Sequence, residues 1–275
     1  MTLVMLWREA RAQRIWLVSD SRLSSLGPAG GVTRLTDHGA KILEARAVAD
    51  NGNPREPPIR QSMLAFAYCG SSLIALNAYA AVLPFWSRLN TIGEPRLPSI
   101  GDFANHLSIF VNRYAGELAA AGLPPTCTCI LVGSDDASAQ LRAWKVTSTS
   151  TPKGPEIKVV EIVLPSGHIE LFGSGARHAG EQLAKVRRPT EGWGREPLDL
   201  IRASLGEDAQ LDVGGGVQIG ALVQDGFDLY FDAPSAAVGS ARVGDPLAAF
   251  KYRGFAFEDV NKIGHAVVSL KGLSR

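Results

Sequence analysis

The sequence predicts an α+β fold, and three observations support this prediction. Alternating or continuous apolar runs are typical of strands, and stretches with apolar residues three or four positions apart are typical of helices. The expected elements follow the order strands, two helices, strands, two helices, strands, which suits two sheets packed face to face between helices. With 275 residues and 45% hydrophobic content, the chain has ample material for a core in one large domain or two small ones.

The first part of the chain predicts strands separated by polar loops. Alternation and β-branched residues indicate the early strands, and a continuous apolar run ending in Gly70-Ser71 indicates the last of them. Glycine- and proline-rich segments between these runs are typical of turns and loops. The strands expected in this part are 2–8, 14–20, 41–45 and 63–69.

Two amphipathic helices should follow these strands. The first runs from 72 to about 89, with Ser72 suited to its N-cap. The second runs from 102 to about 121 and ends at Gly122, before two prolines. The apolar face expected for the first helix consists of Leu73, Leu76, Ala80 and Leu83. The apolar face expected for the second consists of Phe103, Leu107, Phe110, Val111 and Tyr114.

The remainder predicts more strands, two shorter helices and a final hairpin. The pattern fades after Tyr230. We therefore divide the chain into a main domain, 1–232, and a C-terminal extension or assembly arm, 233–275. The expected strands are 127–132, 141–146, 157–163 and 168–172, the helices are 176–186 and 197–205, and the hairpin strands are 217–223 and 227–231.

Charge and hydropathy exclude several classes of function. Basic and acidic residues number 28 and 27, so no surface for nucleic acid or an anionic membrane is indicated. The apolar stretch at 3–7 is too short for a signal peptide and is followed at once by Arg8 and Glu9. The longest apolar stretch, 73–86, is interrupted by Asn77 and Pro84 and is too short to span a bilayer. We expect a soluble, cytoplasmic protein.

The cysteines and histidines do not indicate a metal or cofactor. Three cysteines in a chain of this length are not a disulfide framework. Cys127 and Cys129 are two positions apart on an expected strand, so they share a face and are best explained as small buried residues. The five histidines show no ligand spacing. We expect no metal site and no cofactor.

Thr2 directly follows the initiator methionine, at the head of the first expected strand. If Met1 is removed, this residue carries a hydroxyl nucleophile and a free α-amine that can act as its base, a known form of activated nucleophile. An α-amine has an ordinary pKa of about 7.7–8, so part of it is neutral near pH 7. Thr2 could therefore supply two of the groups that amide hydrolysis needs.

Five further segments follow Thr2 in an order that is informative when they are taken together: Val18-Ser19-Asp20-Ser21-Arg22, Ala40-Lys41-Ile42-Leu43, Ala67-Tyr68-Cys69-Gly70-Ser71, Gly173-Ser174-Gly175 and Gly214-Gly215-Gly216-Val217. Together they resemble the proteasome β-subunit family of N-terminal nucleophile hydrolases, and most closely its bacterial members, which begin Met-Thr and lack a propeptide. The resemblance extends to about Tyr230. It implies a four-layer αββα sandwich.

The resemblance also implies roles for individual residues. Lys41 matches a lysine beside the terminal threonine, and Asp20 matches the aspartate that pairs with it. Gly70 matches the donor of a backbone N–H to the oxyanion, and Ser174 matches a serine near the terminal amine. Each position has a simpler explanation as well: Asp20 and Lys41 as surface charges near turns, Gly70 as a strand-to-helix turn, and Ser174 as the N-cap of the next helix.

A second supporting cluster departs from the family pattern. Strict spacing puts Gln210 where the family has an aspartate and Val213 where it has a serine. Either Asp208 or Asp212 substitutes after a local shift, or the network is degraded.

The resemblance implies a threonine-type peptidase or amidase acting by acyl transfer through Thr2. The alternatives are a proteasome-like self-assembling scaffold without activity, and a small-molecule amidase on the same fold. Members of the family usually assemble into rings or ring-like stacks, so a homo-oligomer is expected. Many act with an ATP-dependent unfolding partner, although nothing in this sequence identifies one.

Overall fold

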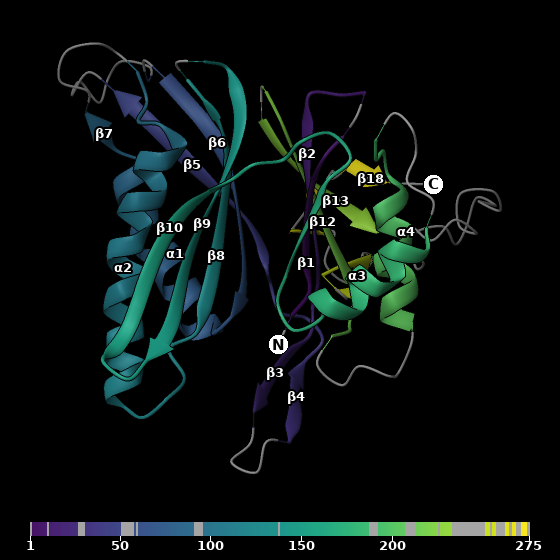
Figure 1. The fold of residues 1–275 in the computed structure, drawn as a ribbon. Helices are drawn as coiled ribbons and strands as arrows, with labels where there is room; N and C mark the ends of the chain where they lie inside the picture. The colour runs from purple at the N-terminus through teal and green to yellow at the C-terminus, as the bar shows by residue number, and fades with distance from the viewer. Residues whose placement is uncertain are drawn as a thin grey trace.

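The computed structural model describes residues 2–9, 11–26, 31–50, 58, 60–90, 96–136, 138–186, 192–206, 213–224, 226–232, 251–253, 255–256, 262–263, 266–267 and 271–273. These residues form two main sheets, two small two-stranded sheets and four helices. The predicted α+β class is therefore confirmed (Figure 1).

The start of the chain lies inside an eight-stranded sheet. Its strands are β1 (Val4–Arg8), β2 (Arg14–Asp20), β11 (Ile169–Phe172), β12 (Val217–Val223), β13 (Gly226–Asp232), β14 (Lys251–Tyr252), β15 (Phe255–Ala256) and β18 (Lys271–Leu273). They follow the order β11-β1-β2-β12-β13-β14-β15, and β18 pairs with β13. Strand β1 thus has a hydrogen-bonded neighbour on each side.

The other main sheet has six strands. They are β5 (Ile42–Asp50), β6 (Arg60–Gly70), β7 (Leu89–Asn90), β8 (Cys127–Asp135), β9 (Gln140–Thr151) and β10 (Gly154–Ile162), in the order β10-β9-β8-β6-β5-β7. Two small sheets pair β3 (Leu23–Leu26) with β4 (Val32–Thr36), and β16 (Lys262–Ile263) with β17 (Ala266–Val267). The β3–β4 hairpin, which extends away from the main sheets in Figure 1, is not among the strands expected from sequence.

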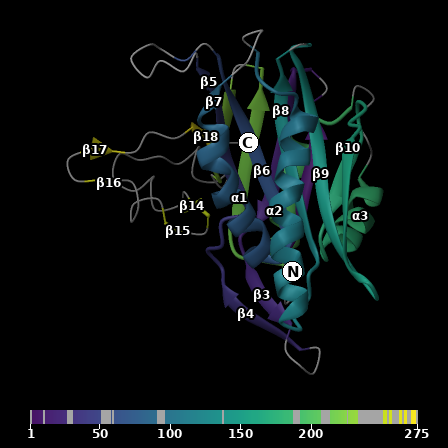
Figure 2. The same cartoon turned by 90° about the vertical axis from the view of Figure 1, so that its left-hand side faces the viewer.

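Four helices lie against the main sheets. Helices α1 (Ser72–Trp86) and α2 (Ile100–Ala120) pack side by side on the six-stranded sheet (Figure 2). Helices α3 (Ala176–Lys185) and α4 (Glu196–Gly206) pack on the eight-stranded sheet. A capping box starts α2: the Ser99 side chain accepts the Asp102 N–H, and the Asp102 side chain accepts the Ser99 N–H.

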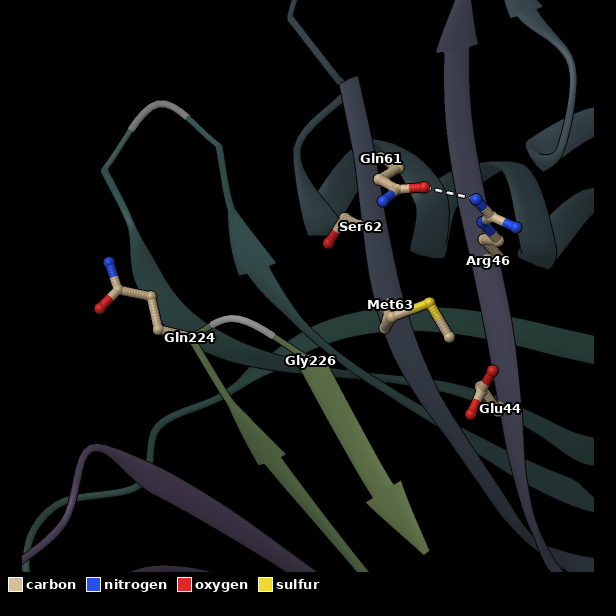
Figure 3. Close-up of a pocket in the computed structure, with 7 residues that line it drawn as sticks. All are labelled: Glu44, Arg46, Gln61, Ser62, Met63, Gln224 and Gly226. Atoms are coloured by element: carbon tan, nitrogen blue, oxygen red, sulfur yellow. Dashed lines mark hydrogen bonds between the residues drawn. The ribbon is translucent and has the colours of Figure 1, made fainter. Parts of the chain in front are cut away.

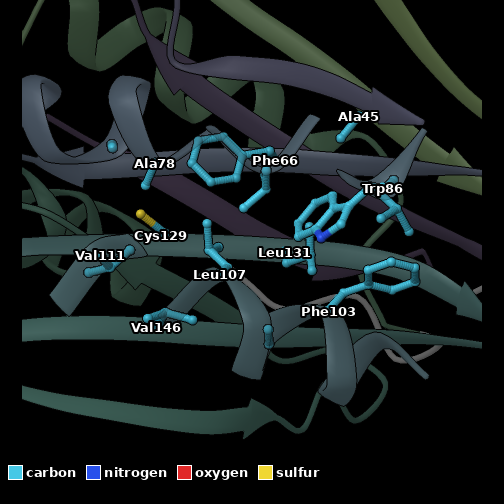
Figure 4. Packing of buried hydrophobic residues seen from close by; sticks show 14 of the residues in the cluster. Ala45, Phe66, Ala78, Trp86, Phe103, Leu107, Val111, Cys129, Leu131 and Val146 are labelled. Carbon is cyan, nitrogen blue, oxygen red and sulfur yellow. The ribbon is translucent and has the colours of Figure 1, made fainter. Parts of the chain in front are cut away.

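Three clusters of buried apolar residues fill the spaces between these elements. The first joins α1 and α2 to the six-stranded sheet and contains Phe66, Trp86 and Leu107 (Figure 4). The second lies between the two main sheets and contains residues such as Leu17 of β2 and Ala67 of β6. The third joins α3 and α4 to the eight-stranded sheet, where the rings of Trp7 and Trp16 stack. The second cluster brings β2, β5 and β6 together, and these strands carry the candidate site.

The prediction for α1 is wrong in two details. Its N-cap is Ser71, whose side chain accepts the Ile74 N–H, and not Ser72. Its buried residues are Ile74, Ala75, Ala78, Val82 and Trp86, whereas Leu73 is 57% exposed. The helix is apolar on most sides, so apolar spacing does not single out one face. For α2, by contrast, the predicted stripe is confirmed, with Phe103, Leu107 and Val111 buried.

Other predictions are confirmed or stay open. Cys127 and Cys129 are both fully buried on one face of β8, as expected. No helix among the described residues has the length and apolar character needed to cross a membrane. Residues 233–250 lie outside the described part of the chain, so the division at 232 stays a prediction.

Candidate active site at the start of the chain

Thr2 lies just ahead of β1 and is only 2% exposed. Its backbone nitrogen donates to Ser174 Oγ at 3.3 Å. Its carbonyl oxygen accepts the Gly175 N–H, also at 3.3 Å. Both partners belong to the turn between β11 and α3, so this turn fixes the first described residue on both sides of its backbone.

The carboxylate of Asp20, the last residue of β2, accepts four hydrogen bonds. Its Oδ1 accepts from the backbone N–H of Leu3 at 3.0 Å and from Lys41 Nζ at 2.7 Å. Its Oδ2 accepts from the backbone N–H groups of Arg22 at 3.2 Å and Gly214 at 3.1 Å. One carboxylate therefore links the residue after Thr2 to a lysine of the other sheet and to the glycine turn before β12.

Lys41 directly precedes β5, and both its side chain and that of Asp20 are 0% exposed. Burial lowers the pKa of Lys41 below its ordinary value, while the charge of Asp20 and its hydrogen bond act in the opposite direction. A buried ion pair adds little net stability because desolvation offsets the attraction, yet removing one partner costs several kcal/mol. Because both side chains are fully buried, the explanation of Asp20 and Lys41 as surface charges is excluded.

Two glycines with positive φ allow close backbone contacts in this region, Gly173 against Thr2 and Gly70 against Thr126. Gly173 has φ +91°, and a Cβ there would lie 2.0 Å from the Thr2 carbonyl oxygen and 3.4 Å from Cys69 Cβ. Gly70, at the end of β6, has φ +90°, and a Cβ there would lie 2.7 Å from the Thr126 carbonyl oxygen. Side chains rarely tolerate this backbone conformation. Both positions therefore require glycine, and the end of β6 lies beside the turn that holds Thr2.

Cys69 also lies at this end of β6, 5% exposed. Burial raises the pKa of its thiol to about 12. The reactive form of cysteine is the thiolate, so this thiol is not an activated nucleophile.

Two further residues hold the site together. Gly214, which belongs to one of the motif segments but had no role assigned to it, donates its N–H to the Asp20 carboxylate. Gln218 was missed in the sequence. Gln218, 3% exposed, donates from Nε2 to the Asp20 carbonyl oxygen at 3.1 Å, and its Oε1 accepts the Lys41 N–H at 3.0 Å. The sequence offered one signal for Gln218, which is a glutamine inside the otherwise apolar strand 217–223. A buried amide needs several hydrogen-bond partners, so such a residue is expected to join neighbouring segments.

The other predicted site residues divide as follows. Ser174 is not the N-cap of α3, because that position is Gly175, which has no side chain to cap with. Val213 is 3% exposed and lies in the cluster beneath α3 and α4. Asp208 and Asp212, and Gln210 between them, lie outside the described residues. In the described part of the chain, no three His, Cys, Asp or Glu side chains are grouped as metal ligands.

A separate pocket of about 430 Å³ lies at the opposite end of β6 (Figure 3). Gln61, Ser62 and Met63 line it from the start of that strand. Glu44 and Arg46 of β5 and the β12–β13 turn complete it, and Arg46 donates to Gln61 Oε1. Since β6 runs from Arg60 to Gly70, the pocket and Thr2 lie at opposite ends of the space between the sheets.

No family model and no curated protein matches the chain. Solved structures do match. Anbu (ancestral beta-subunit) from Yersinia bercovieri aligns with a TM-score of 0.53 and 13% identity, over 80% of this chain and 81% of that one. The Gly-1 mutant of Anbu from Hyphomicrobium sp. strain MC1 aligns with a TM-score of 0.54 and 14% identity, over 83% and 85%. The chain is similar in fold to the Anbu proteins. The helical assembly of the Anbu complex from Pseudomonas aeruginosa gives a TM-score of 0.54 and 14% identity, over 83% and 86%.

This similarity corrects the resemblance read from sequence motifs. The motifs indicated a bacterial proteasome β-subunit of the N-terminal nucleophile hydrolases, whereas the three matching structures reported above are Anbu proteins. At 13–14% identity the similarity concerns the fold alone. The motifs stand at strand ends and glycine turns, which are features of a fold and do not separate one protein group within it from another.

Proposed function

We propose that the chain hydrolyses peptide or amide bonds by acyl transfer, with Thr2 as the nucleophile after removal of Met1. One observation carries the proposal: Asp20 Oδ1 accepts from both the Leu3 N–H and Lys41 Nζ. This shared oxygen links the buried Lys41 to the residue directly after Thr2, whose nitrogen would become the chain terminus on removal of Met1.

The cation has a clear chemical use. A nearby ammonium disfavours the protonated form of an amine and so lowers its pKa. The α-amine of Thr2 would then be mostly neutral near pH 7 and able to accept a proton from its own hydroxyl. The carboxylate of Asp20 opposes the effect of burial on the pKa of Lys41 and so favours the charged form of this lysine.

In the proposed reaction, Thr2 Oγ attacks the substrate carbonyl carbon and its proton passes to the Thr2 amine. The backbone N–H of Gly70 would stabilise the resulting oxyanion and so lower the activation barrier by roughly 3–4 kcal/mol. Collapse of the intermediate breaks the C–N bond, and the ammonium returns the proton to the leaving amine. Water then cleaves the ester; its proton passes through the amine back to Oγ, and the acid leaves.

We assign the remaining parts to the same proposal. Ser174, which accepts the Thr2 N–H, would contact the free amine, and Asp208 or Asp212 would complete the support. The clusters between sheets and helices support the αββα sandwich. A neighbour solved as a helical assembly supports a homo-oligomer, as a ring or a ring-like stack.

One observation favours a scaffold without activity. Thr2 is 2% exposed, and an acyl substrate must reach its Oγ. Met1 is bonded directly to the Thr2 nitrogen, so its removal uncovers this atom first. The two functions therefore differ in whether the processed chain reacts with an electrophile.

Intact mass and covalent labelling decide between them. We expect a mass lacking Met1, and a single adduct at Thr2 with a peptidyl epoxyketone, an electrophile that a hydroxyl and an adjacent free amine attack together. Thr2→Ala should abolish the adduct, whereas Thr33→Ala, at an exposed position, should retain it. A retained Met1, or an unlabelled processed chain, contradicts the proposal. Turnover of peptides compared with small amides then identifies the substrate class.

A further inference from the structure

Gln218 uses its whole hydrogen-bonding capacity inside the protein. Its Nε2 donates to the carbonyl oxygens of Asp20 at 3.1 Å and Gly39 at 2.8 Å. Its Oε1 accepts the N–H groups of Lys41 at 3.0 Å and Ile42 at 3.3 Å. A primary amide has two donors and an oxygen with two lone pairs, so no group is left over.

These four bonds join the two main sheets at the ion pair. Asp20 ends β2 in the eight-stranded sheet, and Lys41 leads into β5 of the six-stranded sheet. Their side chains meet at 2.7 Å across this junction. Gln218 connects the backbones of the same two residues from β12, independently of the ion pair itself.

We propose that Gln218 is a positioning residue for the Asp20–Lys41 pair, acting through the backbone of both members. The consequence for catalysis rests on the proposed function of Thr2, but the effect on Lys41 does not. Gln218 contacts neither the nucleophile nor a reacting atom in this role.

The chemical consequence follows from the groups that face Lys41: the Asp20 carboxylate, the Cys69 thiol and the Arg22 guanidinium. Burial lowers the pKa of Lys41, and Asp20 opposes this most strongly. Electrostatic attraction weakens with separation, so a longer Nζ–Oδ1 contact would lower that pKa further. A lysine that loses its charge no longer lowers the pKa of the Thr2 amine.

The test is Gln218→Met, which keeps the length of the side chain and removes its hydrogen bonds. The Lys41 signal of uniformly labelled protein is titrated by NMR and identified by its absence in Lys41→Arg. We expect the acid dissociation constant of Lys41 to rise roughly tenfold, comparable to the loss of one charge-assisted hydrogen bond. The control is Leu222→Ala, a buried position on the same strand in the cluster between the sheets.

An unchanged Lys41 titration in Gln218→Met, or an equal shift in Leu222→Ala, overturns the proposal. If Gln218→Met does not fold, Gln218→Asn takes its place, since it keeps the amide but is too short to reach all four partners. It should move the titration of Lys41 to lower pH, and no movement overturns the proposal.

Labelling of the Met1-free protein with the peptidyl epoxyketone links this role to catalysis. In Gln218→Met the acidic limb of the rate–pH profile should move to higher pH, because the Thr2 amine becomes more basic. A merely structural role would lower the amount of reactive protein without moving that limb. An unlabelled wild type with a shifted Lys41 refutes the proposed function alone, and a labelled wild type with an unshifted Lys41 refutes the positioning role alone.

Discussion

The two ends of the space between the main sheets carry similar side chains in opposite surroundings. At one end, Asp20 and Lys41 form an ion pair with both side chains 0% exposed. At the other end, Glu44 and Arg46 are exposed and line an open pocket. Strand β6 joins the two ends, with Gln61 in the pocket and Cys69 beside Gly173 of the turn that holds Thr2.

The difference shows that burial, and not residue type, decides how strongly a charged side chain interacts with its neighbours. Exposed charges are screened by water and salt, so an exposed pair contributes about 0–1 kcal/mol and changes neighbouring groups little. At the buried end, the Asp20 carboxylate accepts four hydrogen bonds, and the pKa of Lys41 is lowered by burial. Single substitutions at this end are therefore expected to change the free energy of unfolding far more than substitutions in the pocket.

Neutralising the buried carboxylate should have the largest effect. Asp20→Asn leaves the Lys41 ammonium buried without its counter-charge, which should cost about 3–5 kcal/mol of unfolding free energy. Glu44→Gln in the pocket should change it by less than about 0.5 kcal/mol. Urea unfolding monitored by circular dichroism measures both, and similar losses in the two variants would refute the comparison.

Lys41→Met sharpens this prediction. Asp20 keeps the backbone N–H groups of Leu3, Arg22 and Gly214 when the lysine is removed. We therefore expect Lys41→Met to destabilise less than Asp20→Asn, and the reverse order would contradict our account of the pair.

Gly173→Ala should have the next largest effect. Its Cβ would lie 2.0 Å from the Thr2 carbonyl oxygen, whereas a Cβ at Gly122 meets nothing within 4 Å at a similar φ of +73°. Gly122→Ala should cost about 1–2 kcal/mol from backbone strain alone. Gly173→Ala should cost about 1–3 kcal/mol more, because the contact adds overpacking. Equal losses of unfolding free energy in Gly173→Ala and Gly122→Ala would show that residue 173 is not in close contact with Thr2.

Alkaline pH should destabilise the buried end through Cys69. Its folded pKa of about 12 lies above the ordinary value of 9.0. The neutral Cys69 thiol contributes fully to the free energy of unfolding below pH 9. This contribution is lost as the pH rises toward 12, because the thiol ionises at a lower pH in the unfolded chain than in the folded one. Cys69→Ala should reduce this loss between these limits, while Tyr68, whose pKa burial also raises, should leave part of it. An unchanged pH dependence in Cys69→Ala would contradict the burial of the thiol.

Ser174→Ala should have the smallest effect of this series. It removes the acceptor of the Thr2 N–H and should cost about 0.5–1.5 kcal/mol. Ser62→Ala, in the pocket, is the matched control and should be neutral within the error of the unfolding measurement. A larger loss for Ser62→Ala would mean that the pocket, and not the chain start, is the more ordered end.

Local patterns in the sequence were sufficient for most elements. The strongly amphipathic pattern of α2 predicts that helix well, because one face is buried and the other is exposed. The apolar and β-branched residues of β2 predict a strand, and this strand is buried on both faces, with Leu17 between the sheets and Trp16 beneath α3 and α4. The buried face of α1 could not be predicted, since its apolar residues surround the helix. The β3–β4 hairpin carries no strong alternation, and two short strands give little signal.

The site residues could be predicted only through the order of the motifs that contain them. Taken alone, Asp20 and Lys41 are charged residues near expected turns, and only the resemblance of their segments to a known family made them candidates. That Leu3 and Gly214 would donate to the same carboxylate depends on contacts between residues far apart in the chain. The protein group indicated by the motifs was wrong for a related reason, because short motifs report the fold and do not separate the protein groups that share it.

The account depends most directly on the chemical state of the second residue. Wild-type protein is treated with the peptidyl epoxyketone and digested, and the N-terminal peptide is analysed by tandem mass spectrometry. We expect a peptide that begins at Thr2 and carries one adduct on that residue. A peptide that still begins with Met1, or a free Thr2 without an adduct after prolonged treatment, would contradict the central claim.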